Sequence, residues 1–399
     1  MKSFLEILIK FSQSLAKDLQ SPAKSPLPGP NGEREKMRKL MTTGALLAVA
    51  TSGSLANAQQ VVNVYNWSDY IAEESLAQFT EATGIQVNYD VYDSNDTLEA
   101  RMLAGSSGFD VVVPTGNYLQ RQISAGVYQP LNRDLLPNLV NMDPHLMELA
   151  AAFDPGNEHA VVYMWGTTGI GYNAAAVADR MGADYVVDSW SIVFDPEIAS
   201  KFADCGISFL DDHTEILPPA LRYLGLDPLS TDEADLERAA QLLEAVRPSL
   251  RYFHSSQYIS DLANGEICLA VGWSGDILQA AARAEEAGNG IEVAYAIPNE
   301  GANLWFDMLA IPSDAPHPEA AHAFINYMMD AHVAAQNTNY VQYPNGVAAS
   351  NEFIDPEVLA DPTIYPSAET QANFWTLQPH DSRTDRMITR LWTRVRTGQ

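Results

Sequence analysis

The chain has 399 residues, of which 46% are hydrophobic and 19% charged, and its formal net charge is −28. A chain of this length is too long to fold around one small hydrophobic core, so two domains are expected. The strong negative charge repels nucleic acid and anionic membrane surfaces, which argues against DNA or RNA binding. After the N-terminal region no stretch reaches the roughly 18 consecutive apolar residues of a membrane helix, so a membrane-embedded protein is not expected.

The N-terminal region differs from the rest of the chain. Residues 37–58 have the three parts of a secretory signal peptide: a basic start at Met37-Arg38-Lys39, an apolar run, and the small-residue cleavage motif Ala56-Asn57-Ala58. Cleavage there would leave Gln59 as the first residue of the mature chain. Residues 1–36 are polar and interrupted by proline, so translation is expected to begin at Met37, with residues 1–36 an extension that precedes the signal.

Export changes both the charge balance and the expected state of the cysteines. Residues 1–58 carry 8 basic and 4 acidic residues, so the remaining chain has 15 basic and 47 acidic residues and a formal charge of −32. In an oxidising compartment Cys205 and Cys268 are expected to pair. The long loop that this pair would close stabilises the fold by about 4 kcal/mol in the chain-entropy model. Cys and His are too few at ligand spacing for a metal site, and we expect no metal and no cofactor.

The first elements of the mature chain form a strand, a loop, a helix and a second strand. The pattern predicts a strand at 61–65, a helix that contains Leu76 and Phe79 and ends at Gly84, and a strand at 85–89. Ligands of open α/β sheets bind outside the carboxyl ends of the strands, where Trp67, Ser68 and Asp69 are expected. A ring beside a carboxylate suits a cation with an apolar body. The alternative is a core tryptophan with Asp69 as a helix N-cap.

Strands that end in aromatic, acidic or small polar residues recur along the chain. The pattern predicts strands at 109–113, 206–210 and 267–272 and a strand-like region near Ile297. The residues that follow them are Thr115 to Tyr118, then Asp211, Asp212 and Glu215, then Trp273 to Asp276, and last Trp305 to Asp307. Because such strand ends meet at one edge of a sheet, five of them would build a cleft lined by rings and carboxylates.

The segments between these strands are typical of amphipathic helices. Ser94 or Asn95 is expected to cap a helix that Gly105 ends, and further helices are predicted at 232–246 and 319–329. The C-terminal helix carries a basic stripe at helical spacing, formed by Arg383, Arg386, Arg390 and Arg394. We interpret this stripe as a solvated face, with a surface for a partner as the alternative.

No catalytic motif is present at the required spacing. The run Gly166-x-x-Gly169-x-Gly171 lacks the order of a dinucleotide-binding loop, and His254-Ser255-Ser256 lacks the G-x-S-x-G elbow of a serine hydrolase. We therefore do not expect an enzyme. A secreted hydrolase that uses His254 and Ser255 stays as an alternative, as does a protein that binds iron or another cation.

The chain resembles the periplasmic polyamine-binding proteins of ABC transporters, most closely the putrescine-binding members. The motifs that carry the resemblance are Tyr65 to Ala72 (YNWSDYIA), Gly108 to Pro114 (GFDVVVP), Gly169 to Asn173 (GIGYN) and Arg251 to Tyr258 (RYFHSSQY). The match runs from about Val62 to the C-terminal helix and covers essentially the whole mature chain. The resemblance implies an α/β fold of the type II periplasmic binding protein class, with two lobes joined by a hinge and the ligand cleft between them. Lobe 1 would comprise residues 59–166 and 307–350, and lobe 2 residues 167–306 and 351–399.

The resemblance also implies a set of ligand-binding residues and supports the pairing of the two cysteines. Trp67, Trp273 and Trp305 would form aromatic walls, Asp276 and Asp307 would hold one ammonium group, and Ser68, Asp69 and Glu215 would bound the other end. Tyr70, Thr115, Ser255 and Tyr343 complete the set. Trp305 stands where the close relative has Phe, and Asn117-Tyr118 where it has Ser-Phe, so the chain departs from the relative near its cleft.

The function that the resemblance implies is capture of a polyamine in the periplasm and its delivery to an inner-membrane ABC permease. Putrescine is the expected ligand, because a carboxylate at Asp276 would cap a short diamine. The alternatives are a protein that prefers spermidine and a polyamine sensor that does not take part in transport. A monomer is expected.

Overall fold

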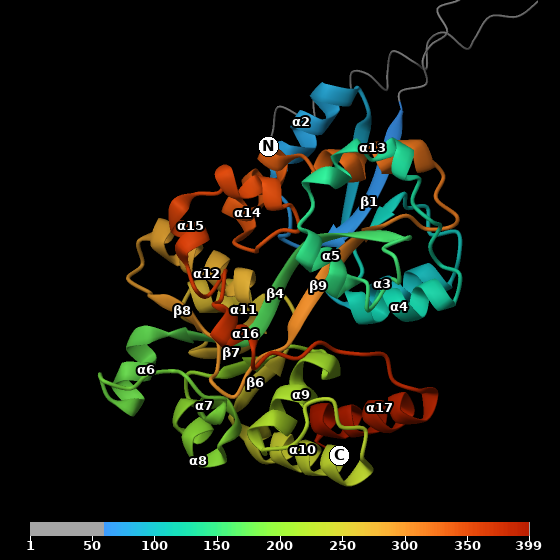
Figure 1. Ribbon diagram of the computed structural model, residues 1–399. Coiled ribbons are helices and arrows are strands. Elements are labelled where there is room, and N and C mark those ends of the chain that lie inside the picture. The colour runs from blue at the N-terminus through green and yellow to red at the C-terminus, as the bar shows by residue number, and fades with distance from the viewer. Residues whose placement is uncertain (1–59, 399) are drawn as a thin grey trace, which may run out of the picture. The chain divides into compact units, whose positions relative to one another are not determined.

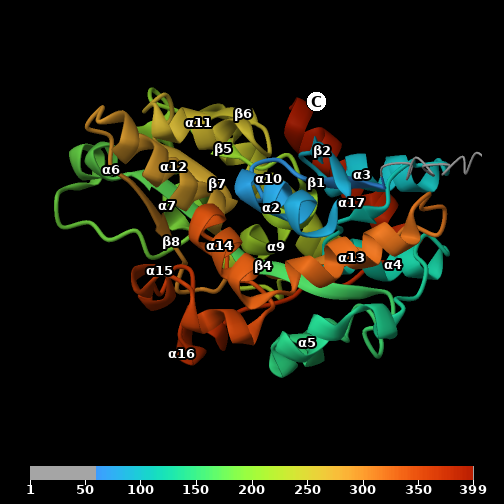
Figure 2. The same cartoon turned by 90° about the horizontal axis from the view of Figure 1, so that it is seen from above.

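The computed structural model describes residues 60–398. The extension and the predicted signal peptide with its cleavage site therefore lie outside the described residues. In the described part of the chain, nine strands form one mixed sheet that helices cover on both faces (Figures 1 and 2). No helix between residues 60 and 398 is long and apolar enough to cross a membrane.

The strand order in the sheet is β2-β1-β3-β9-β4-β7-β5-β6, with β8 paired to β4. The strands are β1 (Val61–Trp67), β2 (Gln86–Tyr92), β3 (Val111–Val112), β4 (Ala160–Asn173), β5 (Ile207–Phe209), β6 (Leu250–Phe253), β7 (Leu269–Trp273), β8 (Val293–Ala296) and β9 (Leu304–Ala310). Strand β1 is parallel to β2 and β3, and β5 is parallel to β6 and β7. Strands β4 and β9 run antiparallel to each other between these two parallel groups.

The helices lie in the connections between the strands and in the C-terminal third of the chain. They are α2 (Glu73–Thr83), α3 (Asn95–Leu103), α4 (Gly116–Ser124), α5 (Pro144–Ala150), α6 (Ala174–Met181), α7 (Ser191–Phe194), α8 (Pro196–Ala199), α9 (His213–Tyr223), α10 (Glu233–Val246), α11 (Gln257–Ala263), α12 (Ser274–Ala287), α13 (Pro318–Met328), α14 (Ala331–Val341), α15 (Pro356–Ala360), α16 (Ala368–Gln371) and α17 (Ser382–Thr397).

Local sequence signals set several of these boundaries. Helix α2 ends at Gly84, whose φ of 74° lies in the left-handed region that glycine tolerates. Ser94, rather than Asn95, caps α3 by accepting a hydrogen bond from the amide of Thr97. The interpretation of Asp69 as a helix cap is wrong, because the N-cap residue of α2 is Ala72.

Buried apolar side chains form two large cores, one at each end of the sheet. The first contains residues from 62–165 and 305–347, and the second contains residues from 170–295 and 388–395. Figure 1 shows β4 and β9 running side by side from one of these regions to the other. Residues in the middle of β4 and β9 therefore lie between the two cores.

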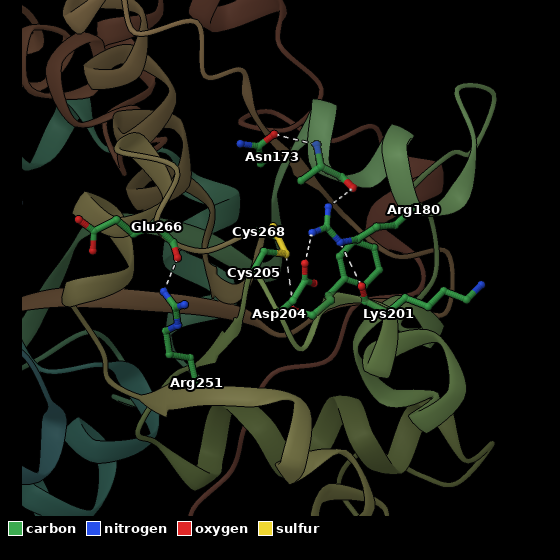
Figure 3. The surroundings of a disulfide bond; sticks show 10 residues. Asn173, Arg180, Lys201, Asp204, Cys205, Arg251, Glu266 and Cys268 are labelled. Atoms are coloured by element: carbon green, nitrogen blue, oxygen red, sulfur yellow. Dashed lines mark hydrogen bonds and ion pairs between the residues drawn. A yellow bond between two sulfur atoms is a disulfide. The ribbon is translucent and has the colours of Figure 1, made fainter.

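The predicted disulfide is present and joins Cys205 to Cys268. Cys205 precedes β5 and Cys268 directly precedes β7, so the bond ties together the amino ends of two paired strands. Figure 3 shows the bond beside an ion pair in which Arg180 lies 2.8 Å from Asp204. The disulfide lies at the end of β7 opposite to Trp273, which ends that strand.

Candidate functional site

A cavity lies where the carboxyl ends of β1, β5 and β7 meet the middle of β9. It encloses about 450 Å³, which includes solvent at its open side. Its lining consists of Trp67, Ser68, Tyr70, Asp93, Asn95, Thr115, Glu215, Ser255, Trp273, Asp276, Trp305, Asp307 and Tyr343. Of the residues expected at the site, only Asp69 is absent from this lining, and two residues that were not expected, Asp93 and Asn95, are part of it.

The sheet register explains why residues distant in sequence meet at this cavity. Trp273 at the end of β7 lies opposite Thr168 of β4, and Thr115 after β3 forms a bridge with Asp307. Trp305 and Asp307 do not follow a strand, as the sequence suggested, but lie inside β9. Side chains two apart on a strand point to the same face, so Trp305 and Asp307 both reach the cavity.

Aromatic rings form much of the cavity wall. The rings of Trp67 and Trp273 meet edge to face with centroids 5.6 Å apart, and those of Trp305 and Tyr343 meet similarly at 5.4 Å. The indole nitrogen of Trp67 donates a hydrogen bond of 2.9 Å to the carbonyl of Val113, which fixes its ring. Trp67 also belongs to the first core. The two interpretations of this residue, core and cavity wall, are therefore both correct.

Asp276 is buried and held by two tyrosine hydroxyls. Tyr258 donates to one carboxylate oxygen at 2.7 Å, and Tyr343 donates to the other at 2.8 Å. Tyr343 approaches the start of α12 so closely that a β-carbon on Gly275 would lie 2.4 Å from its ring, so glycine is needed there. Burial raises the pKa of Asp276 to about 6, and the two hydroxyls oppose this shift.

Asp307 is the second buried carboxylate of the cavity. It accepts a hydrogen bond of 2.7 Å from the hydroxyl of Thr115, which in turn accepts one of 2.9 Å from the side-chain amide of Asn95. Burial raises the pKa of Asp307 to about 7, and the negative charge of Asp276 adds to the shift. Asp276 and Asp307 therefore lie near enough to repel each other when both are ionised.

Glu215 is the third buried carboxylate and lies in the first turn of α9. It accepts hydrogen bonds from the hydroxyl of Thr168 and from the side-chain amide of Asn303, both of which lie on the segments that cross between the cores. Burial raises its pKa to about 7, and the charge of Asp212 at the start of the same helix adds to the shift.

Asp69 lies beside the cavity rather than in it. Its φ of 55° is in the left-handed region, and its carboxylate forms an ion pair of 2.7 Å with Arg283 of α12. The pair is exposed, so it contributes little to stability on its own. Asp93 and Asn95 directly follow β2, and the rule that was applied to the other strand ends would have identified them as well.

The geometry of His254 does not support a hydrolase. Its Nδ1 accepts hydrogen bonds of 3.1 Å from the amides of Ser256 and Gln257, so this nitrogen caps its own turn. The Ser255 hydroxyl accepts a hydrogen bond of 3.2 Å from the amide of Asp211. No hydrogen bond between His254 and Ser255 is present in the described residues, although a nucleophile and its base need one.

The cavity combines apolar rings with buried negative charge. Between residues 60 and 398, no Arg, Lys or His forms an ion pair with Glu215, Asp276 or Asp307. Buried carboxylates without a cationic partner are costly and favour binding of a cation. Rings around them favour a cation with an apolar body.

Three comparisons of sequence give consistent results. A sequence profile described as bacterial extracellular solute-binding protein matches residues 74–366. The putrescine-binding periplasmic protein of Pseudomonas aeruginosa is 51% identical over 359 residues, which cover 89% of this chain and 98% of that protein. The putrescine-binding periplasmic protein of Escherichia coli is 48% identical over 360 residues, with coverages of 90% and 97%.

Solved structures show the same architecture. A putative spermidine/putrescine ABC transporter protein from Listeria monocytogenes superimposes with a TM-score of 0.76 at 30% identity, covering 85% of this chain and all of that one. A lipoprotein from Treponema pallidum gives a TM-score of 0.70 at 25% identity, with the same coverages. The overall fold of this chain is therefore shared with these proteins.

Proposed function

This chain belongs to the family of bacterial extracellular solute-binding proteins, and we propose that it captures putrescine and delivers it to an ABC permease. Its fold is the two-lobed type II periplasmic binding fold that the sequence predicted. The observation that carries the proposal is the set of three buried carboxylates, Glu215, Asp276 and Asp307, among aromatic walls in one cavity.

The physical chemistry of a diamine matches this cavity. Each ammonium group loses water on binding and needs a carboxylate to compensate. The four methylenes between the ammonium groups gain about 0.8 kcal/mol each when rings cover them. We assign one ammonium to the pair Asp276 and Asp307, and the other to Glu215 with Ser68. Trp67, Trp273 and Trp305 cover the methylenes in this arrangement.

Lobe closure follows from the position of these groups. We place residues 59–166 and 307–350 in lobe 1 and residues 167–306 and 351–399 in lobe 2, and the two separate cores support this division. Ile354, Val358 and Ile364 pack with Ala335, so the segment 354–364 also contacts lobe 1. A ligand that contacts Asp307 of lobe 1 and Asp276 of lobe 2 binds the closed form better and shifts the equilibrium toward it.

The protein acts in the periplasm as a monomeric receptor without catalytic activity in this proposal. The periplasmic location named for the relatives and the predicted signal at residues 37–58 support export. A permease partner is supported by the ABC transporter names of the structural neighbours. A polyamine sensor would bind the same ligand. Uptake of labelled putrescine by cells with and without the gene separates the two roles, because loss of a sensor leaves the transport itself intact.

Calorimetric titration with putrescine, cadaverine, spermidine and spermine tests the proposed ligand. We expect the tightest binding for putrescine, because two ammonium groups with a short spacer match the carboxylates of the cavity. Absence of binding to every polyamine would refute the proposal. Binding of iron or hydrolysis of esters by the purified protein would favour one of the other functions considered above.

Spermidine is the second candidate ligand, because an acidic outer pocket adjoins the cavity. Asp93, Ser94, Asp211, His254 and Ser255 line this pocket, and Asp93 and Ser255 also line the cavity. A third ammonium group could reach this pocket. However, Arg396 of α17 forms an ion pair of 2.9 Å with Asp211, so the charge of Asp211 is already compensated. If spermidine binds tighter than putrescine in the titrations, the outer pocket is part of the binding site.

A further inference from the structure

The buried charges of the cavity exceed the charge of the proposed ligand. Glu215, Asp276 and Asp307 are each at least nine-tenths buried, and none has an ion-pair partner among residues 60–398. Arg283, a cation near Asp276, forms its ion pair with Asp69. A diamine carries two positive charges, so its complex with three ionised carboxylates would leave one negative charge uncompensated in a site of low dielectric.

The surroundings of the Asp276 and Glu215 carboxyl groups favour the ionised form of each. Both carboxylate oxygens of Asp276 accept hydrogen bonds from tyrosine hydroxyls. Both oxygens of Glu215 accept from the side-chain amide of Asn303, and one also accepts from Thr168. Both residues lie in the first turn of a helix, where the helix dipole favours a negative charge.

Asp307 has fewer donors, and the direction of its hydrogen bond is determined. Thr115 accepts from Asn95, so the hydroxyl proton of Thr115 points to Oδ1 of Asp307. The side-chain oxygen of Asn95 accepts from the amide of Thr115, which identifies the other Asn95 atom as the donor. Oδ2 of Asp307 has no hydrogen bond of good geometry, with the Tyr70 hydroxyl as its neighbour, and this oxygen can carry a proton.

The groups that face Asp307 do not supply a positive charge. They are Tyr70 from the loop after β1, Tyr92 from β2, Tyr163 from β4 and Asp276 from α12. Burial raises the pKa of all three tyrosines well above the usual value, so they are neutral at physiological pH. The Tyr70 hydroxyl is buried and has no hydrogen-bond partner of good geometry. Next to Asp307, this hydroxyl accepts a hydrogen bond from the protonated carboxyl or donates one to the ionised carboxylate, and donation lowers the pKa of Asp307.

We propose that Asp307 keeps its proton when a diamine binds. Two ionised carboxylates, those of Asp276 and Glu215, then pair with the two ammonium groups of the ligand. This inference rests on the proposed binding of a diamine. Asp307 then contributes a neutral hydrogen-bond donor beside the ammonium group that Asp276 holds. Two like charges that share one buried site rarely ionise together, which is the physical basis for a single proton on this pair.

Counting the protons that putrescine binding releases at pH 6.5 tests the proposal. The count is obtained by calorimetry in several buffers of different ionisation enthalpy. At this pH the free cavity holds nearly two protons on the three carboxyls, given pKa values of about 6, 7 and 7. We expect release of less than one proton, because one stays on Asp307. Release of nearly two protons would overturn the proposal.

A matched pair of variants gives a second measurement. Asp307→Asn replaces a protonated carboxyl by a neutral group of the same shape, so we expect putrescine affinity to change less than tenfold and proton release to stay near one. Glu215→Gln removes an ionised partner, so we expect a loss of affinity of about a hundredfold. A hundredfold loss in Asp307→Asn would overturn the proposal. Failure of the unmodified protein to bind any polyamine would instead refute the proposed function.

Discussion

Replacing Asp276 by asparagine separates the charge of the cavity from its shape. The side chain keeps its size, but only its amide oxygen can accept a hydrogen bond, so one of the hydroxyls of Tyr258 and Tyr343 loses its acceptor. The substitution therefore removes one negative charge and one hydrogen bond. Because Asp276 is the ionised partner of one ammonium group in the proposed complex, its loss leaves that ammonium unpaired in a desolvated site.

The substitution is expected to weaken the binding of putrescine but to stabilise the empty protein. Breaking a buried ion pair costs about 3 kcal/mol, which corresponds to a roughly 150-fold weaker binding of putrescine. In the empty protein the raised pKa of about 6 means that the ionised Asp276 destabilises the fold at neutral pH. The shift from 3.8 corresponds to a free energy on the order of 3 kcal/mol. The loss of one hydrogen bond costs about 1 kcal/mol, so Asp276→Asn should still raise the stability of the empty protein.

Calorimetry with putrescine and thermal unfolding with and without it measure both effects. Asp93→Asn is a suitable control, because Asp93 lines the same cavity but is exposed, and we expect its affinity to change by less than about threefold. An Asp276→Asn protein that binds putrescine as tightly as the unmodified chain would refute the assigned role. A lower stability of the empty variant at neutral pH would refute the account of the buried charge.

Three further predictions concern pH, the aromatic wall and the disulfide. Burial raises the pKa values of Glu215, Asp276 and Asp307, so the protonated groups contribute most to the stability of the empty protein below pH 4. This contribution is lost as the pH rises to about 7. Putrescine affinity should increase over the same range. Trp273→Ala should weaken putrescine binding about tenfold, through lost ring contact with the ammonium and methylenes. Changing both Cys205 and Cys268 to serine should lower the free energy of unfolding by up to about 4 kcal/mol and leave putrescine affinity unchanged.

Each of these predictions has its own control. Denaturant unfolding of the empty protein between pH 4 and pH 8 checks the pH prediction, with a Glu215→Gln variant as the control. The prediction would be contradicted if the free energy of unfolding of the unmodified protein rose toward pH 7 while that of the variant did not. Trp273→Phe retains a ring and should recover most of the affinity that Trp273→Ala loses. For the disulfide, a large loss of putrescine affinity would show that the bond also positions the cavity.

Local signals in the sequence were sufficient for some of the elements, but the central strands β4 and β9 were not predicted. Alternating apolar residues identified β1 and β2, because side chains on a strand face opposite sides of the sheet, and a continuous apolar run identified β7. Ser94 and Gly84 mark the ends of helices through interactions with their own backbone neighbours, which need no tertiary contact. The rule that ligands bind at strand ends, together with the family motifs, identified eleven of the thirteen cavity residues.

Tertiary structure alone decided the position of residues whose setting depends on pairing between distant strands. Trp305 and Asp307 lie in a central strand rather than after one, because β9 pairs with both β3 and β4. Asp69 belongs to an ion pair with Arg283, a residue 214 positions away, which no local pattern reveals. The protonation state of the carboxylates also follows only from the fold. Burial, the neighbouring charge and the direction of the hydrogen bonds that end at Asp307 are set by packing between segments far apart in the sequence.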